Sequence, residues 1–331
     1  MNKKGFTLIE LLAVIVILAV IALIATPIIM NAISNAKQGA WKDAAYGIIK
    51  ATENAFAKGF SETTYQVDTF FLYENGVMTS YPSGKTIDYK GSAPQDGGIV
   101  LHSDGSVTLA IHDGVNCAVK AKTAGTVTVS TSDKATCVSN IYYKQASAPF
   151  SNLLTNGDFS SGITNWVAAG STHSVSNKIM TNISTGIINA GQEWNNTALT
   201  YTVGNIVYAS AMMLPPAEST AIRLQLEGGQ VEQIKWQTSI PGVWQKISGV
   251  LTTTKTLTGP RLWLAHIYPN AATATGKSCN ISEVVFLNLT SLYGAGNEPT
   301  AAQMDNNLNK VWIDSTTNTP KRFTAGGWIN F

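Results

Sequence analysis

The chain has 331 residues, of which 13% are charged, and its formal net charge is +2. This weak charge provides no basic field for nucleic acid, so we expect no nucleic-acid partner. A chain of this length is expected to hold two domains, because single hydrophobic cores usually stop growing at about 250–300 residues.

The N-terminus combines two lysines with a long apolar run. Lys3 and Lys4 precede this run, and Glu10 is its only ionisable side chain from residue 6 to residue 30. A helix of about 20 apolar residues can cross a bilayer core, and flanking lysines stay on the cytoplasmic side. The pattern predicts one membrane helix over residues 6–30, with the rest of the chain outside the cytoplasm.

Glu10 needs a partner, because a carboxylate near the edge of a membrane helix costs free energy when it is unpaired. No lysine, arginine or histidine follows within a helical turn. The available cation is an amino group made by cutting the chain between Gly5 and Phe6. An ordinary signal peptide or a plain membrane anchor would also have a basic start and an apolar run, but neither accounts for Glu10.

The run from Lys4 to Glu10, Lys-Gly-Phe-Thr-Leu-Ile-Glu, resembles the processing site of type IV prepilins and type II secretion pseudopilins. The resemblance implies that a prepilin peptidase removes residues 1–5 and methylates the Phe6 amine. It also implies that Glu10 then meets the Phe6 ammonium of a neighbouring subunit in a filament. Pro27 stands where such pilins often carry a helix-loosening proline. Such a protein lies in the cytoplasmic membrane before assembly and in an extracellular pilus afterwards, and its partners are other pilin subunits and the assembly machinery.

A pilin-like head is predicted after the membrane segment. Apolar residues continue at three- to four-residue spacing beyond Pro27, which indicates one long helix that lies on a globular head and stops near Lys58-Gly59. Residues 61–98 are expected to be loop-rich, with a strand at 67–72. Strands are expected at 99–102, 106–112, 116–122 and 126–130, joined by Asp-Gly and other glycine turns. This order gives an α+β head over residues 31–145 with an antiparallel sheet, and it resembles small pilin heads.

The three cysteines suit an oxidising exterior and one disulfide. Cys117 and Cys137 bracket the last hairpin of the head, and because pilins commonly staple this loop, the resemblance implies a bond between them. The alternative is two unpaired thiols. Closing a loop of this size would stabilise the fold by roughly 3 kcal/mol. Cys279 would be left over, and a lone cysteine is usually buried.

A second domain is predicted after an uncharged linker at residues 146–150. Its opening, Asn-Gly-Asp-Phe at 156–159 with Gly162 and Trp166 following, resembles the start of jelly-roll carbohydrate-binding modules of the galactose-binding-like type. Short alternating segments over residues 172–289 predict eight or more strands, and hence an all-β jelly-roll sandwich over 151–331. The segment 288–300 resembles the end of such domains, with a short helix beginning after Pro299.

The resemblance implies glycan binding through aromatic rings that stack on sugar rings, with polar groups beside them. Arg223 and Gln225 alternate with leucines, as does Trp263, so these three share an outer sheet face if the leucines face the core. The alternative places Trp263 in the core, where Trp166 is expected. The aromatic candidates are Trp194, Trp236, Trp244, Trp263, Tyr201, Tyr208 and Tyr268. The chosen ligand contacts are Trp263, Arg223, Gln225, Trp236 and Trp244.

The same resemblance implies a structural Ca²⁺ between the opening loop and the last strand, with Asp158 and Glu283 as oxygen donors. Calcium takes six to eight oxygens, and the sequence offers only these two carboxylates for the site. No other cofactor is implied. The sequence has no catalytic motif of the nucleophile-elbow, phosphate-loop or paired metal-ligand type, so we expect a non-enzyme. The leading hypothesis is a minor type IV pilin that displays a lectin-like domain for adhesion to glycans or surfaces. The alternatives are a pseudopilin of a secretion or DNA-uptake machine whose extra domain binds a client or scaffold protein, and a hydrolase tethered at the surface.

Overall fold

The computed structural model describes residues 7–61, 68–195, 199–228 and 231–331. The chain divides into two compact units, Met1–Ile141 and Tyr142–Phe331. The predicted linker at 146–150 therefore lies inside the second unit. The boundary comes earlier because residues 142–145 form a strand of a sheet in that unit.

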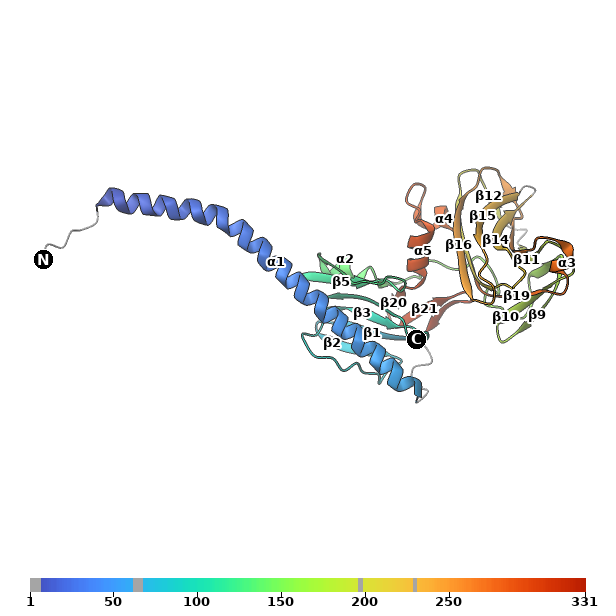
Figure 1. The fold of residues 1–331 in the computed structure, drawn as a ribbon, viewed down its shortest axis with the longest axis horizontal. Coiled ribbons are helices and arrows are strands. Elements are labelled where there is room, and N and C mark those ends of the chain that lie inside the picture. Colours follow the sequence, from blue (N-terminus) through green and yellow to red (C-terminus); the bar gives the residue numbers. More distant parts are fainter. Residues whose placement is uncertain (1–6, 62–67, 196–198, 229–230) are drawn as a thin grey trace. The chain divides into compact units, whose positions relative to one another are not determined.

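The first element, α1 (Leu8–Ser61), is a single bent helix that contains both the predicted membrane segment and its continuation (Figure 1). Within the described residues it is the one helix long and apolar enough to span a membrane. The helix runs through Pro27, which lacks the N–H for one helical hydrogen bond. Beside it, the Thr26 hydroxyl donates to the Ala22 carbonyl at 2.6 Å. The predicted stop at Lys58-Gly59 agrees with the observed end to within the usual uncertainty of helix termini.

The head of the first unit is a six-stranded antiparallel sheet in the order β2-β1-β3-β4-β5-β6. Its strands are β1 (Thr69–Glu74), β2 (Val77–Tyr81), β3 (Asp96–Leu101), β4 (Val107–His112), β5 (Asn116–Lys120) and β6 (Thr128–Thr131). Strand β2 was not predicted. It follows the turn Asn75-Gly76, in which both residues have positive φ, as a tight hairpin requires.

One face of α1 closes the core of the first unit. Trp41, Ala45 and Ile48 are buried in one cluster with Phe71 and Ile99 of the sheet. The polar side chains between them remain on the other face of the helix, as the spacing predicts. The α+β head is therefore confirmed.

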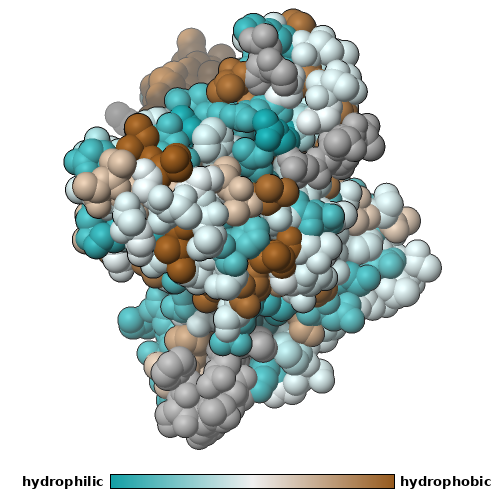
Figure 2. Space-filling model, turned by 90° about the vertical axis from the view of Figure 1, so that its right-hand side faces the viewer, coloured by the Kyte–Doolittle hydropathy of each residue, from teal (hydrophilic) through white to brown (hydrophobic). Residues whose placement is uncertain are grey.

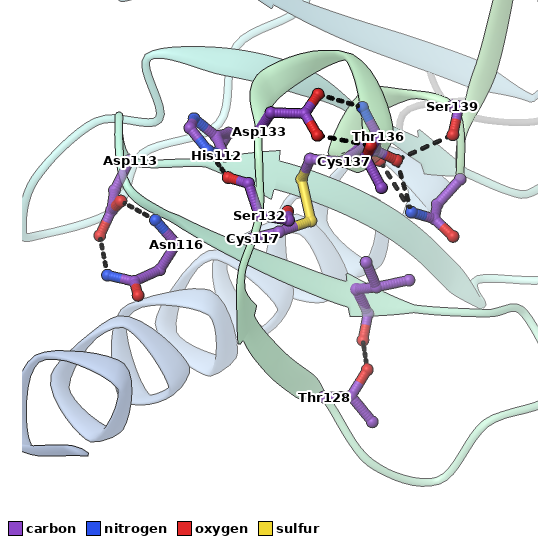
Figure 3. Close-up of a disulfide and its surroundings, with 12 residues drawn as sticks. His112, Asp113, Asn116, Cys117, Thr128, Ser132, Asp133, Thr136, Cys137 and Ser139 are labelled. Carbon is purple, nitrogen blue, oxygen red and sulfur yellow. Dashed lines mark hydrogen bonds between the residues drawn. A yellow bond between two sulfur atoms is a disulfide. The ribbon is translucent and has the colours of Figure 1, made fainter. Parts of the chain in front are cut away.

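The predicted disulfide between Cys117 and Cys137 is present (Figure 3). Cys137 lies on the short helix α2 (Lys134–Val138), which begins at Asp133. The Asp133 carboxylate accepts hydrogen bonds from the Thr136 N–H at 2.9 Å and from its hydroxyl at 2.6 Å, as a helix N-cap does. This cap holds the helix at the point where the disulfide joins it to β5.

The second unit is a sandwich of two five-stranded antiparallel sheets, so the all-β prediction is confirmed. The first, called the β13 sheet, has the order β16-β13-β19-β10-β9, and the second, called the β14 sheet, has the order β15-β14-β18-β11-β8. Their strands, with the small pair β12–β17 and helix α3, are β8 (Trp166–Ala169), β9 (Ser171–Ser176), β10 (Ile179–Ser184), β11 (Asn189–Asn195), β12 (Thr200–Tyr201), β13 (Ile206–Leu214), β14 (Ala221–Glu227), β15 (Val231–Thr238), β16 (Gln245–Thr252), β17 (Leu257–Thr258), β18 (Arg261–Ile267), α3 (Ala271–Ala274) and β19 (Ser278–Asn288).

The core of the sandwich is built from the alternate residues of both sheets, and Cys279 lies in it. Trp194 is 1% exposed and contacts Phe286 edge-on. Asn152 ties the opening loop to this core. Its amide nitrogen donates to the carbonyls of Val284 at 2.9 Å and Ala325 at 2.7 Å.

The last 43 residues, from Leu289 to Phe331, form a third layer instead of sandwich strands. This layer contains α4 (Leu289–Tyr293), α5 (Ala301–Leu308) and a four-stranded sheet in the order β22-β21-β20-β7. The sheet strands are β7 (Tyr142–Gln145), β20 (Val311–Asp314), β21 (Pro320–Thr324) and β22 (Gly327–Asn330). Met304 of α5 and Phe150 pack on Tyr208 and Leu287. The layer therefore covers the part of the outer face of the β13 sheet that β13 and β19 form.

Candidate functional site

The outer face of the β14 sheet collects aromatic and charged side chains from four strands. We call this surface the open face. Strand register places Arg223 of β14 opposite Trp236 of β15, and Gln225 of β14 opposite Trp263 of β18. Alternate residues of a strand point to opposite sides, so the core-facing leucines between them fix these side chains outward. The open face consists of Glu193, Arg223, Gln225, Glu227, Trp236, Arg261 and Trp263.

Arg223 lies between two tryptophan rings. Its guanidinium carbon is 4.9 Å from the ring centroid of Trp263 and 5.8 Å from that of Trp236. Both distances fall within the range of cation–π attraction. Trp236 is 44% exposed, so it offers a flat aromatic surface to solvent directly beside the cation.

Trp263 packs against small residues of the same face. A Cβ atom added to Gly191 of β11 would stand 2.6 Å from the Trp263 ring nitrogen, and Ala265 is fully covered. Only a side chain as small as glycine leaves room for the ring at this position. The indole forms a half-buried floor of the open face.

Two donors of the open face have no acceptor within the described part of the chain, namely Nε of Arg223 and Nε1 of Trp263. Buried donors are nearly always hydrogen-bonded in proteins. Burial lowers the pKa of the Arg223 guanidinium, against the opposing effect of the Glu227 carboxylate. An acceptor oxygen brought to this place would satisfy groups that the described residues leave unsatisfied.

The other end of the open face is a closed ion-pair network. Arg261 donates to Glu193 at 2.5 Å and to Glu227 at 3.1 Å. The Gln225 amide donates to Glu227 at 2.5 Å. Both carboxylates are thus held by one arginine.

The structure brings together four of the five predicted ligand residues, namely Arg223, Gln225, Trp236 and Trp263. Trp244 is not on a strand of this face and comes directly before β16 of the other sheet. The aromatic candidates Trp194, Tyr201, Tyr208 and Tyr268 are buried, so they offer no ring for stacking. Glu193, Glu227 and Arg261 were not among the predicted ligand contacts, although the alternation that placed Gln225 and Trp263 outward also places Glu227 and Arg261 there.

The calcium prediction concerns a different place, where the opening loop meets β19. The Asp158 carboxylate is 3.3 Å from the Lys178 ammonium, and Glu283 accepts from the Ala325 N–H at 3.2 Å. Within the described residues no group of three or more His, Cys, Asp or Glu side chains could hold a metal. Calcium needs six to eight oxygens, whereas these oxygens already accept from N–H and ammonium donors. The calcium site stays a prediction.

The predicted processing site begins outside the described residues, since Gly5 and Phe6 lie there. Glu10 is described and lies in the first turn of α1. Its carboxylate accepts hydrogen bonds from the Thr7 backbone N–H and the Thr7 hydroxyl, both at 2.8 Å. The partner of Glu10 in the single chain is therefore Thr7.

Residues 1–26 match the family model of the prokaryotic N-terminal methylation motif. The chain carries the methylation motif of the type IV pilin family. Glu10 and the first half of the apolar helix lie within this motif. No curated protein matches the chain.

Three solved structures similar to part of the chain are carbohydrate-binding modules. They are the CBM22-1 and CBM22-2 xylan-binding domains of Xyn10C from Paenibacillus barcinonensis and a family 16 carbohydrate-binding module. CBM22-1 is 16% identical with a TM-score of 0.34, over 44% of this chain and 97% of its own. CBM22-2 is 19% identical with a TM-score of 0.34, over 43% and 99%. The family 16 module is 16% identical with a TM-score of 0.31, over 41% and 100%. These values are too low to assign a ligand.

Proposed function

We propose that this chain is a minor type IV pilin whose second unit binds glycans through the open face. The methylation motif together with a single apolar helix supports the pilin part. The observation that carries the glycan part is the stacking of Arg223 between Trp236 and Trp263 on an outer sheet face. Such a subunit would present a glycan-binding surface on a filament and so serve adhesion.

In this proposal the N-terminal segment directs assembly of the subunit into a filament. A prepilin peptidase cuts after Gly5 and methylates Phe6, while α1 is held in the cytoplasmic membrane by its apolar first half. On extraction into the filament, the Glu10 carboxylate exchanges its hydrogen bonds with Thr7 for the ammonium of a neighbouring subunit. An ion pair in an apolar helix bundle is stronger than in water because the surroundings screen it less.

The second unit supplies recognition. A sugar ring stacked on the exposed face of Trp236 buries apolar C–H surface, and its hydroxyl oxygens can accept from the donors beside it. The chemistry favours binding over hydrolysis. Glu193 and Glu227 are both held by Arg261, whereas a glycosidase needs one carboxyl group protonated to act as an acid.

The alternative is a pseudopilin of a secretion or DNA-uptake machine whose extra domain binds a client or scaffold protein. The same N-terminus would serve either protein. Filaments sheared from the surface separate the two, because a pilin is recovered in them and begins at a methylated phenylalanine.

The glycan part is tested with the full-length protein in detergent on an array of immobilised polysaccharides. We expect binding that Trp236→Ala reduces at least tenfold. Trp244→Ala is the matched control, because Trp244 is another partly exposed tryptophan of the same unit that lies off the open face, and it should bind as the wild type does. Binding that survives Trp236→Ala, or no binding to any glycan, would contradict the proposal.

A further inference from the structure

The charges of the open face are unevenly paired. At one end Arg261 holds both Glu193 and Glu227. At the other end Arg223 makes no ion pair or hydrogen bond with any described residue, and its contacts are the two indole rings. The face therefore carries one cation that is not bonded to any described anion, next to its most exposed aromatic ring; the Glu227 carboxylate acts on it only through its electrostatic field.

Some other cations of the second unit have anionic partners, whereas Lys310 and Lys321, like Arg223, lie over aromatic rings. Lys178 pairs with Asp158, Lys246 with Asp305 and Lys277 with Glu218. These lysines are more exposed than a half-buried arginine and have less need of a partner. Arg223 is partly desolvated and its Nε is fully covered, and a desolvated charge without a counter-ion costs free energy. Binding an anion from outside the protein would offset the cost of burying this guanidinium.

We propose that the open face binds acidic polysaccharides, with a hexuronate carboxylate on Arg223 and the hexuronate ring on Trp236. This inference rests on the proposed glycan function and names its ligand class. A carboxylate is planar and matches the fork of guanidinium donors. In a hexuronate the carboxylate is attached directly to the pyranose ring, so the charge and the ring that stacks lie side by side. Arg223 and Trp236 lie side by side in the same way, with 5.8 Å between the guanidinium carbon and the ring centroid.

The rest of the face limits how many carboxylates fit. Beyond Trp263 the surface carries Glu193 and Glu227, and their one shared arginine leaves that end with an excess of negative charge. A second carboxylate placed there would be repelled. The face therefore takes one uronate with neutral sugars beyond it, and polymers in which uronate and neutral sugars alternate should bind more tightly than uninterrupted polyuronates.

The test compares each polysaccharide with its own carboxyl-reduced form, using the full-length protein in detergent. The probes are hyaluronan, glucuronoxylan, polygalacturonate and alginate, each native and after reduction of its carboxyl groups to alcohols. We expect at least one native polymer to bind at least tenfold more tightly than its reduced form. Arg223→Met should abolish this preference, and Arg223→Lys should keep part of it. Lys235→Met is the control, because it removes one exposed positive charge from the neighbouring strand β15 and should leave the preference unchanged.

The outcomes separate this inference from the function on which it rests. Equal binding of native and reduced forms, still lost in Trp236→Ala, would overturn the acidic ligand and keep glycan binding. A preference for native polymers that persists in a folded Arg223→Met protein would also overturn it. Binding to no glycan of any kind would overturn both proposals. Thermal unfolding of Arg223→Met, followed by tryptophan fluorescence, shows whether the variant is folded.

Discussion

Thr7 and Glu10 form reciprocal hydrogen bonds at the start of α1. The Thr7 N–H and hydroxyl donate to the Glu10 carboxylate, and the Glu10 N–H donates to the Thr7 hydroxyl oxygen at 3.3 Å. This reciprocal pair is a capping box, which satisfies two helix N–H groups at once. The sequence led us to expect that only a cut N-terminus could partner Glu10. In the single chain the carboxylate already has a partner, and in the proposed filament the ammonium of a neighbouring subunit would replace it.

The two residues of this cap should differ in their effect on assembly. Glu10→Ala removes the partner for the neighbouring ammonium, so we expect the protein in the membrane fraction and none in sheared filaments. Thr7→Ala removes only the cap, a loss of about 1 kcal/mol, and should still be incorporated. Thr7→Ser keeps the hydroxyl and is the control. Immunoblots of both fractions decide the matter, and a Glu10→Ala subunit recovered in filaments at the wild-type level would refute the exchange.

The Cys117–Cys137 bond should stabilise the first unit by closing a loop with a sequence separation of 20 residues. Replacing both cysteines by serine is expected to lower the free energy of unfolding of this unit by roughly 3 kcal/mol, because the unfolded chain gains freedom. Calorimetry of the full-length protein should show one transition at lower temperature. Reductant should shift the same transition in the wild type and in Cys279→Ala, and leave the double serine variant unchanged. A reductant effect that persists in the double variant would show that the bond is not its source.

Local sequence patterns predicted the parts of the structure that local patterns determine. The helical spacing gave α1, and the alternation of Arg223, Gln225 and Trp263 with leucines placed these side chains on one outer face. The Asn75-Gly76 turn was equally informative, and the hairpin of β1 and β2 could have been predicted from it. Short strands at the C-terminus could not be predicted in the same way. Strand β20 pairs in parallel with β7, which lies far earlier in the chain, and no local period encodes such a pairing.

The errors among the aromatic residues have a related cause. Alternation separates two faces of a strand but does not say which face another element will cover. Tyr208 points to the outer side of its sheet, yet it is buried because α5 lies on it, and its hydroxyl donates to Asp305 at 2.6 Å. Trp194 and Trp263 lie on neighbouring strands, and only the register decides that one fills the core while the other floors the open face.

Calcium removal should leave the second unit unchanged if Asp158 and Glu283 are arranged as described. The Lys178 ammonium neutralises Asp158, so a calcium ion would first have to displace it. We expect the thermal midpoint of the full-length protein to be the same in excess EGTA and in excess calcium. Lys178→Met removes the ammonium partner of Asp158. If its thermal midpoint rises with calcium while that of the wild type does not, the lysine is the group that excludes the ion. A midpoint of the wild type that rises with calcium would restore the site predicted from the sequence.

His266 makes the stability of the second unit sensitive to pH. It is fully buried in the core between the sheets, where its ring contacts the Asn182 side-chain oxygen at 2.5 Å and the Tyr268 hydroxyl at 2.7 Å. Because the Asn182 oxygen can only accept, Nε2 carries the proton and Nδ1 accepts from Tyr268. Burial lowers the pKa of His266 to about 4. The neutral ring is therefore fully satisfied, and the charged ring is disfavoured.

The unfolded chain binds a proton at this histidine below a pKa of about 6.5, whereas the folded protein binds it only below about 4. Between these values the unfolded state holds more protons, so stability is fully present above about 6.5 and falls as the pH falls towards 4. From pH 7 to pH 5 we expect a loss of about 2 kcal/mol from this group. Denaturant unfolding followed by tryptophan fluorescence reports on this unit, since every tryptophan except Trp41 lies in it. His266→Gln keeps an amide in the network without a titrating group. It should lose about 2 kcal/mol less than the wild type over that interval, and equal losses in the two proteins would show that another group governs the response.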